Sequence, residues 1–141
     1  MQERLKLLAE SEQGLTVISA ALQDAIARVS DIKFNKRAAT LSLITSRFMR
    51  ENDGAKRVLS TLYFNNILAL RSRGILRQDP DAFMVLLAIE YEAEKGGSSG
   101  TIKLLFAGGG ELCADAEYIE ARLIDTALPR PTKREPLHPD V

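Results

Sequence analysis

The chain has 141 residues and a mass of 15.5 kDa, the size of one globular domain. Nineteen Lys and Arg balance nineteen Asp and Glu, which argues against a protein built mainly to hold nucleic acid or an anionic membrane. No apolar run approaches the roughly 20 residues that span a bilayer. The single cysteine fits a reducing compartment, so we expect a cytoplasmic domain.

The N-terminal region combines one helix with short strands. Residues 5–8 form an apolar stretch that predicts an edge strand. From Ser11 to about Val29 the apolar residues recur every three or four positions, which predicts an amphipathic helix with Ser11 as its N-cap. After Ser30 the apolar period becomes two, which predicts strands near 32–34 and 40–48, joined by a turn.

The central region is rich in strand-forming residues. The run 58–75 would be about three times the length of a usual strand if fully extended. We expect Asn65 and Asn66 to interrupt it with a hairpin turn or a bulge. The segment 83–91 begins with apolar residues on both faces, which is typical of a strand covered on both sides.

Glycine-rich turns organise the rest of the chain. Residues 96–100 and 108–110 predict two hairpin connections around a strand at 101–106, with a further strand at 112–116. The segment 118–125 is compatible with a helix by propensity, but we favour a strand because it follows an antiparallel return. Four prolines after residue 128 predict a disordered tail at 128–141, which leaves 1–127 as a single domain.

These elements predict an α+β fold, because one helix is followed by consecutive strands with short turns. We expect the N-terminal amphipathic helix to pack on a mostly antiparallel, twisted sheet. Curling of this sheet towards an open barrel is the alternative. A parallel sheet is disfavoured, since no crossover helices separate the strands.

Four segments carry a resemblance to a known family: LTVISAALQDA (15–25), LALRSRGI (68–75), GTIKLLFAGGG (100–110) and YIEARLID (118–125). Together they resemble an uncharacterised bacterial family, the domain of unknown function 2948. The likeness runs in order from about residue 5 to residue 125, nearly the whole domain. The resemblance implies no activity, cofactor or site residue.

Few side chains are suited to catalysis. The only histidine, His138, lies in the proline-rich tail, whereas a base or metal ligand must be held in fixed geometry. One histidine and one cysteine cannot supply a structural zinc site. Glu111 and Asp115 flank Cys113 and should raise its pKa, which disfavours a reactive thiol. We therefore predict a protein without metal or cofactor that is not an enzyme.

Two further motifs receive ordinary structural interpretations. The glycines at 108–110 lack the following helix and the Lys-Ser/Thr pair of a phosphate-binding loop, so they predict a hairpin turn. Glu90, Glu92 and Glu94 share one face of the predicted strand. We interpret them as a solvated or ion-paired face rather than a carboxylate site.

Charge is distributed unevenly along the chain. Residues 31–77 hold ten Lys and Arg against three Asp and Glu, whereas residues 78–125 hold three against ten. The two segments could pair across neighbouring strands, which we favour, or form separate faces. Separate faces would create a basic patch led by Arg47, Arg50, Arg71, Arg73 and Arg77.

Two functional hypotheses follow from the residues. The first is a non-catalytic domain that acts through a protein–protein interface, as an accessory subunit or by self-association, because strands that are apolar on both faces need cover. The alternative is a domain that binds a small ligand or anion with the cluster Arg47, Arg71, Arg73 and Arg77. We expect neither nucleic acid nor membrane as a partner.

Overall fold

The computed structural model describes residues 4–50, 55–127 and 130–131. In chain order its elements are β1 (Lys6–Ala9), α1 (Glu12–Ala21), β2 (Ile26–Arg28), η1 (Val29–Asp31), β3 (Ile32–Asn35), β4 (Thr40–Phe48), β5 (Lys56–Phe64), β6 (Ile67–Arg73), β7 (Phe83–Ala93), β8 (Gly100–Phe106), η2 (Ala107–Gly109), β9 (Glu111–Ala116), β10 (Ala121–Asp125) and β11 (Arg130–Pro131). The predicted α+β class is confirmed, because one α-helix packs on an antiparallel sheet.

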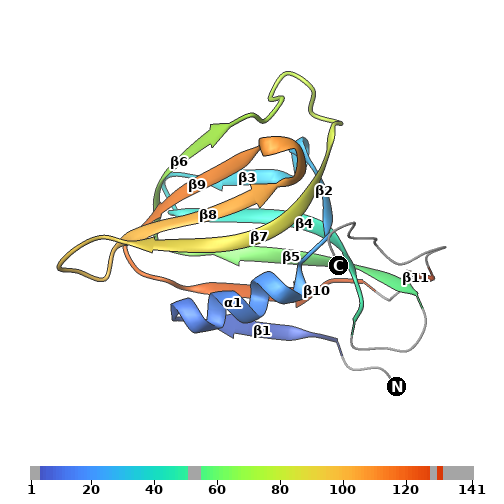
Figure 1. The fold of residues 1–141 in the computed structure, drawn as a ribbon, viewed down its shortest axis with the longest axis horizontal. Helices are drawn as coiled ribbons and strands as arrows, with labels where there is room; N and C mark the ends of the chain where they lie inside the picture. Colours follow the sequence, from blue (N-terminus) through green and yellow to red (C-terminus); the bar gives the residue numbers. More distant parts are fainter. Residues whose placement is uncertain (1–3, 51–54, 128–129, 132–141) are drawn as a thin grey trace.

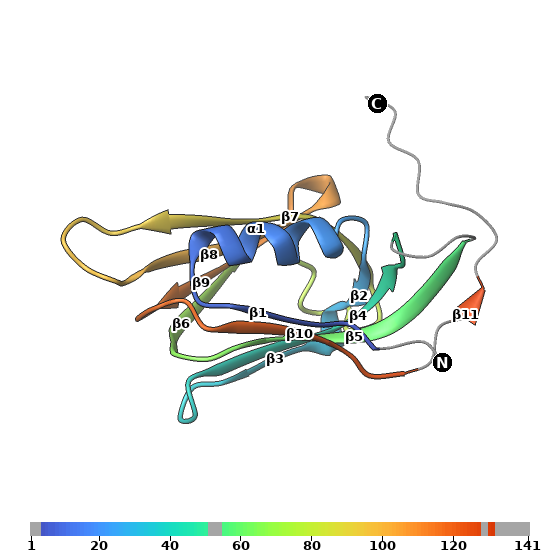
Figure 2. The same cartoon turned by 90° about the horizontal axis from the view of Figure 1, so that it is seen from below.

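The strands form one antiparallel sheet in the order β1-β10-β5-β4-β2-β7-β8-β9-β6, with β3 beside β4 and β11 beside β5. This sheet folds over into two layers (Figures 1 and 2). The first layer contains β1, β10, β5, β4 and β3, the second contains β7, β8, β9 and β6, and β2 joins them through β4 and β7. The terminal strands β1 and β6 do not pair with each other, so the sheet is not closed into a barrel.

The helix α1 completes the second layer beside β7 and covers β1 and β10 of the first (Figure 2). Ser11 caps it as predicted, because its hydroxyl accepts a hydrogen bond of 3.1 Å from the backbone N–H of Gly14. Leu15 and Ile18 fill the core between the layers. No helix in the described part of the chain has the length and apolarity needed to cross a membrane.

The predicted helix was too long, since α1 ends at Ala21 rather than near Val29. Asp24 adopts a left-handed backbone conformation with φ of 69°, and its N–H bonds to the carbonyl of Leu86. The chain thus leaves the helix to join the sheet as β2. Ala25 and Ala27 are buried as alternate residues of an extended segment, while Ala25, Ile26 and Val29 happen to continue the helical spacing of apolar residues.

Asn65 and Asn66 do interrupt the long central run, but neither a hairpin nor a bulge joins its two halves. The strand β5 pairs with β4, β10 and β11, whereas β6 pairs with β9 in the other layer. Asn66 adopts a left-handed conformation with φ of 63°, a region that asparagine tolerates better than most residues. The chain therefore changes layers at this position.

The remaining strands agree with the sequence pattern in position, but the expected cover on both faces of β7 is wrong, because Phe83 is 69% and Leu87 is 42% exposed. Two hairpins join β7 to β8 and β8 to β9, and η2 contains the glycine turn between the latter pair. The segment of uncertain type contains β10, a strand that pairs with both β5 and β1. In the predicted tail, Arg130 and Pro131 form β11, and residues 128–129 and 132–141 lie outside the described residues.

Candidate functional site

Arg47, one of the four predicted binding residues, points from β4 into the core and is 1% exposed. Its guanidinium makes two hydrogen bonds of 2.9 Å to the two carboxylate oxygens of Asp125 on β10. The same carboxylate accepts a hydrogen bond of 2.6 Å from the Ser60 hydroxyl and one of 3.1 Å from the Leu5 backbone N–H. This buried network links β4, β5 and β10 to the start of β1.

The hydrogen bonds decide the protonation of Asp125. Burial acts to raise the pKa of this carboxyl, because a charged group loses water there. The hydrogen bonds from Arg47, Ser60 and Leu5, together with the positive charge of Arg47, outweigh burial and hold the pKa below its ordinary value. The Asp125 carboxylate thus stays charged inside the protein, and Arg47 neutralises this negative charge.

Arg71 and Arg73 lie together on the outward face of β6, and acidic residues of β9 pair with both. Arg71 contacts Asp115 at 2.6 Å and Arg73 contacts Glu111 at 3.1 Å. Together with Arg47 and Asp125, these pairs join the basic segment 31–77 to the acidic segment 78–125. The favoured interpretation of the charge asymmetry, pairing across neighbouring strands, is confirmed for Arg71 and Arg73, whereas Arg47 and Asp125 pair across β5, which lies between their strands.

Arg77 lies in the loop after β6, and it lines a cavity of about 600 Å³ together with Arg71. The cavity opens between the β6–β9 side of the second layer and the η1–β3 segment of the first, which lie far from α1 (Figure 1). Most of its lining is apolar, and the lining residues are Val29, Ser30, Ile32, Leu70, Arg71, Ser72, Ile75, Arg77, Pro80 and Leu112. We call it the β6–β3 cavity. The structure thus brings together Arg71 and Arg77, while Arg73 stays outside the lining and Arg47 lies in the core.

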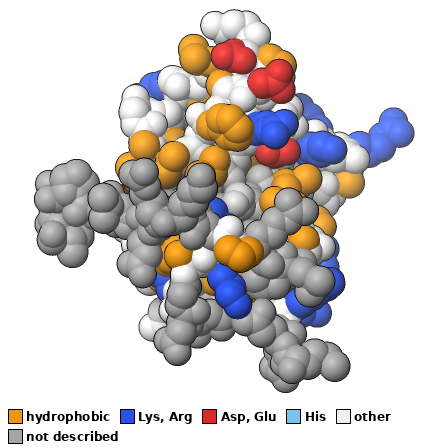
Figure 3. Space-filling model, turned by 90° about the vertical axis from the view of Figure 1, so that its right-hand side faces the viewer, with side chains coloured by type: hydrophobic (Ala, Val, Ile, Leu, Met, Phe, Trp, Pro, Cys, Tyr) orange, Lys and Arg blue, Asp and Glu red, His pale blue; other side chains and the backbone are white. Residues whose placement is uncertain are grey.

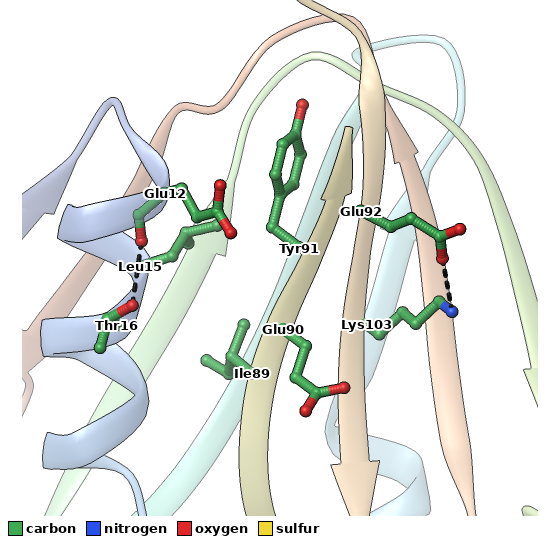
Figure 4. Close-up of a pocket in the computed structure, with 8 residues that line it drawn as sticks. All are labelled: Glu12, Leu15, Thr16, Ile89, Glu90, Tyr91, Glu92 and Lys103. Atoms are coloured by element: carbon green, nitrogen blue, oxygen red, sulfur yellow. Dashed lines mark hydrogen bonds and ion pairs between the residues drawn. The ribbon is translucent and has the colours of Figure 1, made fainter. Parts of the chain in front are cut away.

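A second hollow of about 450 Å³ lies between α1 and β7 (Figure 4). Its carboxylates do not converge: Glu92 turns away to pair with Lys103 at 2.8 Å, and Glu90 points in another direction from Glu12. Farther along the hairpin, Glu94 accepts a hydrogen bond from Ser99. Glu92 is therefore ion-paired as predicted, and Glu90 and Glu94 are exposed to solvent.

The groups most often used for catalysis are unfavourably placed. Burial raises the pKa of the Cys113 thiol, and a hydrogen bond to Glu111 raises it further. The predicted direction of this pKa shift is confirmed, and Glu111 is one of the two neighbours invoked for it. His138 lies outside the described residues. Among the residues that are described, no group of three His, Cys, Asp or Glu side chains could hold a metal ion.

The sequence reasoning missed an apolar surface on the outward side of the first layer and its continuation onto β7. The register and the burial pattern place its side chains on five neighbouring strands, β10, β5, β4, β2 and β7. Its members are Ile26, Ile44, Leu59, Phe83, Val85 and Ile124, which we call the outer apolar face. Phe83 is 69% exposed and Leu59 is 48% exposed. A hollow of about 240 Å³ opens between Ile26, Ile44, Leu59 and Phe83.

Cations border the outer apolar face. Outward-pointing strand positions around it carry Lys6, Arg28, Lys33, Arg57 and Arg122. The guanidinium of Arg28 stacks over the Phe83 ring at 5.5 Å, and that of Arg122 stacks over Tyr63 at 4.6 Å. In Figure 3, Lys and Arg side chains gather along the right-hand side of the molecule with apolar groups between them.

These border cations differ from the arginines of β6 because no described residue forms an ion pair with any of the five. The outward positions of β1 to β5 and β10 hold no carboxylate. Asp31 of η1 lines the hollow, and its carboxylate accepts a hydrogen bond of 2.9 Å from the backbone N–H of Arg28. The outer apolar face is therefore surrounded by positively charged side chains.

A weak signal for this surface exists in the sequence. Ile44 and Leu59 occupy positions that alternate with core residues, where a soluble one-sided sheet would carry polar side chains. Joining them into one surface requires the register between β4, β5 and β2, and β2 was assigned to the helix. The local pattern therefore could not reveal the surface.

Comparison with known proteins identifies a family whose function is unknown. The model of the family described as "Protein of unknown function (DUF2948)" matches residues 5–138, nearly the whole chain. No curated protein and no solved structure matches the sequence or the fold.

Proposed function

Since the chain belongs to the DUF2948 family of proteins of unknown function, we propose from its geometry that it is a non-catalytic, cytoplasmic binding domain. It acts by docking a protein partner on the outer apolar face. The raised pKa of Cys113 and the divergent carboxylates beside α1 support a role without catalysis. One half-buried free cysteine fits the reducing cytoplasm.

The observation that carries this proposal is a group of apolar side chains on the outward side of the sheet, of which Ile44, Leu59 and Phe83 are exposed to solvent. Contiguous apolar patches on soluble monomers mark interaction sites when they are rimmed by polar groups. Here the hollow between Ile44, Leu59 and Phe83 can take up one apolar anchor side chain from a partner. Interfaces of this kind draw most of their affinity from a few such buried anchors.

The border charges define the partner's chemistry. Arg28, Lys33 and Arg122 offer cations that no described carboxylate neutralises. The fitting partner is a protein segment that combines large apolar side chains with Asp or Glu, because charge complementarity steers association and suppresses wrong partners. Self-association through this face would oppose cations to cations across a two-fold axis, so we favour a different protein as the partner.

The shape of the surface favours a protein over a lipid or a nucleic acid. Peripheral membrane proteins insert amphipathic helices or lipid anchors, whereas the outer apolar face is the broad side of a sheet. Single-stranded nucleic acids stack their bases on open aromatic rings. The rings of Phe83 and Tyr63 each have an arginine guanidinium of the protein itself over one face.

A peptide selection tests the proposal. Peptides displayed on phage are selected on the wild-type domain, and their binding is measured with the variants Leu59→Asp and Arg28→Glu. The matched control is Leu68→Asp, a change at a leucine that is 53% exposed on β6, away from the outer apolar face. We expect selected sequences that join Asp or Glu to large apolar residues, with binding lost in both face variants and kept in the control.

Three outcomes would overturn this proposal. The first is a selection that yields no binders, or binders without acidic residues. The second is equal binding to wild type and Leu59→Asp. The third is binding of phosphatidylserine-rich vesicles or of oligouridylate that Leu59→Asp abolishes, since the face would then serve a membrane or an RNA.

A further inference from the structure

The β6–β3 cavity is separate from the outer apolar face and has the dimensions of a small-molecule site. Its volume of about 600 Å³ falls within the range of known ligand pockets. It lies where the two layers separate, and its inner wall includes Leu70 and Leu112, which face the core. Val29, Ile32 and Ile75 extend this apolar wall. A ligand body placed there would meet hydrocarbon on several sides.

Four of the ten residues that line this cavity are polar: two arginines and two serines. Arg77 forms no ion pair with a described residue, and the hydroxyls of Ser30 and Ser72 have no hydrogen-bond partner among the described residues. Arg71 is already paired with Asp115. Asp79 and Asp81 occur in the same loop as Arg77, but neither lines the cavity. One cation without an ion pair, one paired arginine and two hydroxyls therefore lie beside six apolar residues.

We propose that the β6–β3 cavity binds a small amphipathic monocarboxylate. Its apolar body lies against Leu70, Ile32 and Leu112, and its carboxylate meets the guanidinium of Arg77 at the mouth. A planar guanidinium offers paired N–H donors that match the two oxygens of a carboxylate. This site is independent of the proposed partner surface, since the two share no lining residue.

The charge balance selects a monoanion. Because Asp115 compensates Arg71, only Arg77 supplies a free positive charge. A phosphate monoester carries between one and two negative charges at neutral pH and would leave charge uncompensated beside an apolar wall. A sugar phosphate or nucleotide would also need polar partners along its whole length, which Val29, Ile75 and Pro80 do not provide.

Octanoate and its neutral counterpart octanol are suitable probes, followed through the backbone-amide NMR spectrum of the full chain. We expect octanoate to shift the amides of residues 29–32, 70–72 and 75–79 and to bind more tightly than octanol. Arg77→Gln should weaken octanoate binding about tenfold and leave octanol binding unchanged, since it removes a charge-assisted hydrogen bond.

Two further variants serve as controls. Arg73→Gln changes a neighbouring arginine that does not line the cavity, so octanoate should bind this variant as it binds wild type. Ser72→Phe places a ring in the cavity and should abolish binding of both probes. Both positions are exposed, so neither change threatens the fold.

The outcomes separate this site from the partner surface. Leu59→Asp should leave octanoate binding unchanged. Amide shifts confined to the outer apolar face, or the absence of any shift, would overturn the proposal. An equal effect of Arg77→Gln and Arg73→Gln would overturn it as well, because the carboxylate would then respond to net charge alone. Tighter binding of phenyl phosphate than of benzoate would also contradict a site for monocarboxylates.

Discussion

At the scale of single residues, Asp125 is held by hydrogen bonds from three parts of the chain. They come from Arg47, Ser60 and the backbone of Leu5, which is 120 positions away in the sequence. Arg47 was predicted as a binding residue, yet its guanidinium is buried against this carboxylate. A buried pair contributes less by its own attraction than it costs to break, since removal of one partner leaves a charge without water.

Removal of one partner should therefore be far more damaging than removal of both. We expect Asp125→Ala to lower the free energy of unfolding by about 3–5 kcal/mol, because the buried guanidinium of Arg47 would lose the carboxylate that compensates its charge. The double variant Arg47→Met/Asp125→Leu should recover most of this loss. Urea denaturation followed by circular dichroism measures the free energy of unfolding of both variants. A loss below about 1 kcal/mol in the single variant would contradict this account.

The lowered pKa of Asp125 predicts a dependence of stability on pH. A carboxyl whose pKa is lower in the folded than in the unfolded state binds fewer protons when folded. Its contribution is complete above the unfolded value of about 4 and is lost as the pH falls through the folded pKa. Asp125→Asn cannot titrate, so its urea midpoint should fall less between pH 7 and pH 3 than that of wild type. Parallel curves for the two proteins would refute this role.

At the scale of elements, α1 is tied to β7 by one side chain as well as by packing. The Ser19 hydroxyl accepts a hydrogen bond of 2.8 Å from the backbone N–H of Ile89. Beyond Val85 no strand pairs with this side of β7, and the helix takes the place of a neighbouring strand. The helix α1 and the strand β7 are thus joined by a hydrogen bond in addition to their apolar contacts.

Loss of the Ser19 hydroxyl should weaken the contact between α1 and β7. Ser19→Ala leaves the Ile89 N–H without its acceptor, which costs about 1–3 kcal/mol for a buried donor. Hydrogen exchange should speed up at the Ile89 amide, while the amide of Leu104 on β8 serves as an internal reference. Thr16→Ala is the matched control, since the Thr16 hydroxyl bonds only within the helix. Equal exchange of Ile89 in the two variants would contradict the connection.

The sequence predicts individual elements better than their connections. Alternating apolar residues indicated β4, β8 and β9, because each has one buried face and one more exposed face. The end of α1 was missed, since β2 continues the helical spacing by chance. The layer change at Asn66 was also missed, because only the distant strand β9 determines where β6 pairs.

At the scale of the whole molecule, the two layers distribute charge in opposite ways. The second layer carries cations and carboxylates that pair across strands, as at Arg71, Arg73 and Lys103. The outer side of the first layer carries cations without carboxylates on its strands. Local charge runs predicted the first arrangement correctly. They could not predict the second, because its residues come from five strands that are distant in sequence.

The two sides of β5 should differ strongly in how well they tolerate a charged substitution. Leu59 is 48% exposed on the outer apolar face, whereas Leu62 is fully buried in the core. We expect Leu59→Asp to change the free energy of unfolding by no more than about 0.5 kcal/mol and Leu62→Asp to abolish cooperative unfolding. Thermal unfolding measures this difference. Light scattering should show the wild type as a monomer, and a dimer that Leu59→Asp dissociates would identify a second copy as the partner.

The pairing of β1 with β10 has a consequence for how the chain is made. Lys6 lies opposite Ile124 and Ala9 opposite Ala121, so β1 finds its neighbour only after more than 110 further residues have left the ribosome. During synthesis, β1 lacks its pairing partner and α1 lacks its contacts with β10 until that strand arrives. A nascent chain arrested before Ala121 should therefore recruit chaperones and be digested rapidly by proteases, whereas a chain extended beyond Asp125 should resist them.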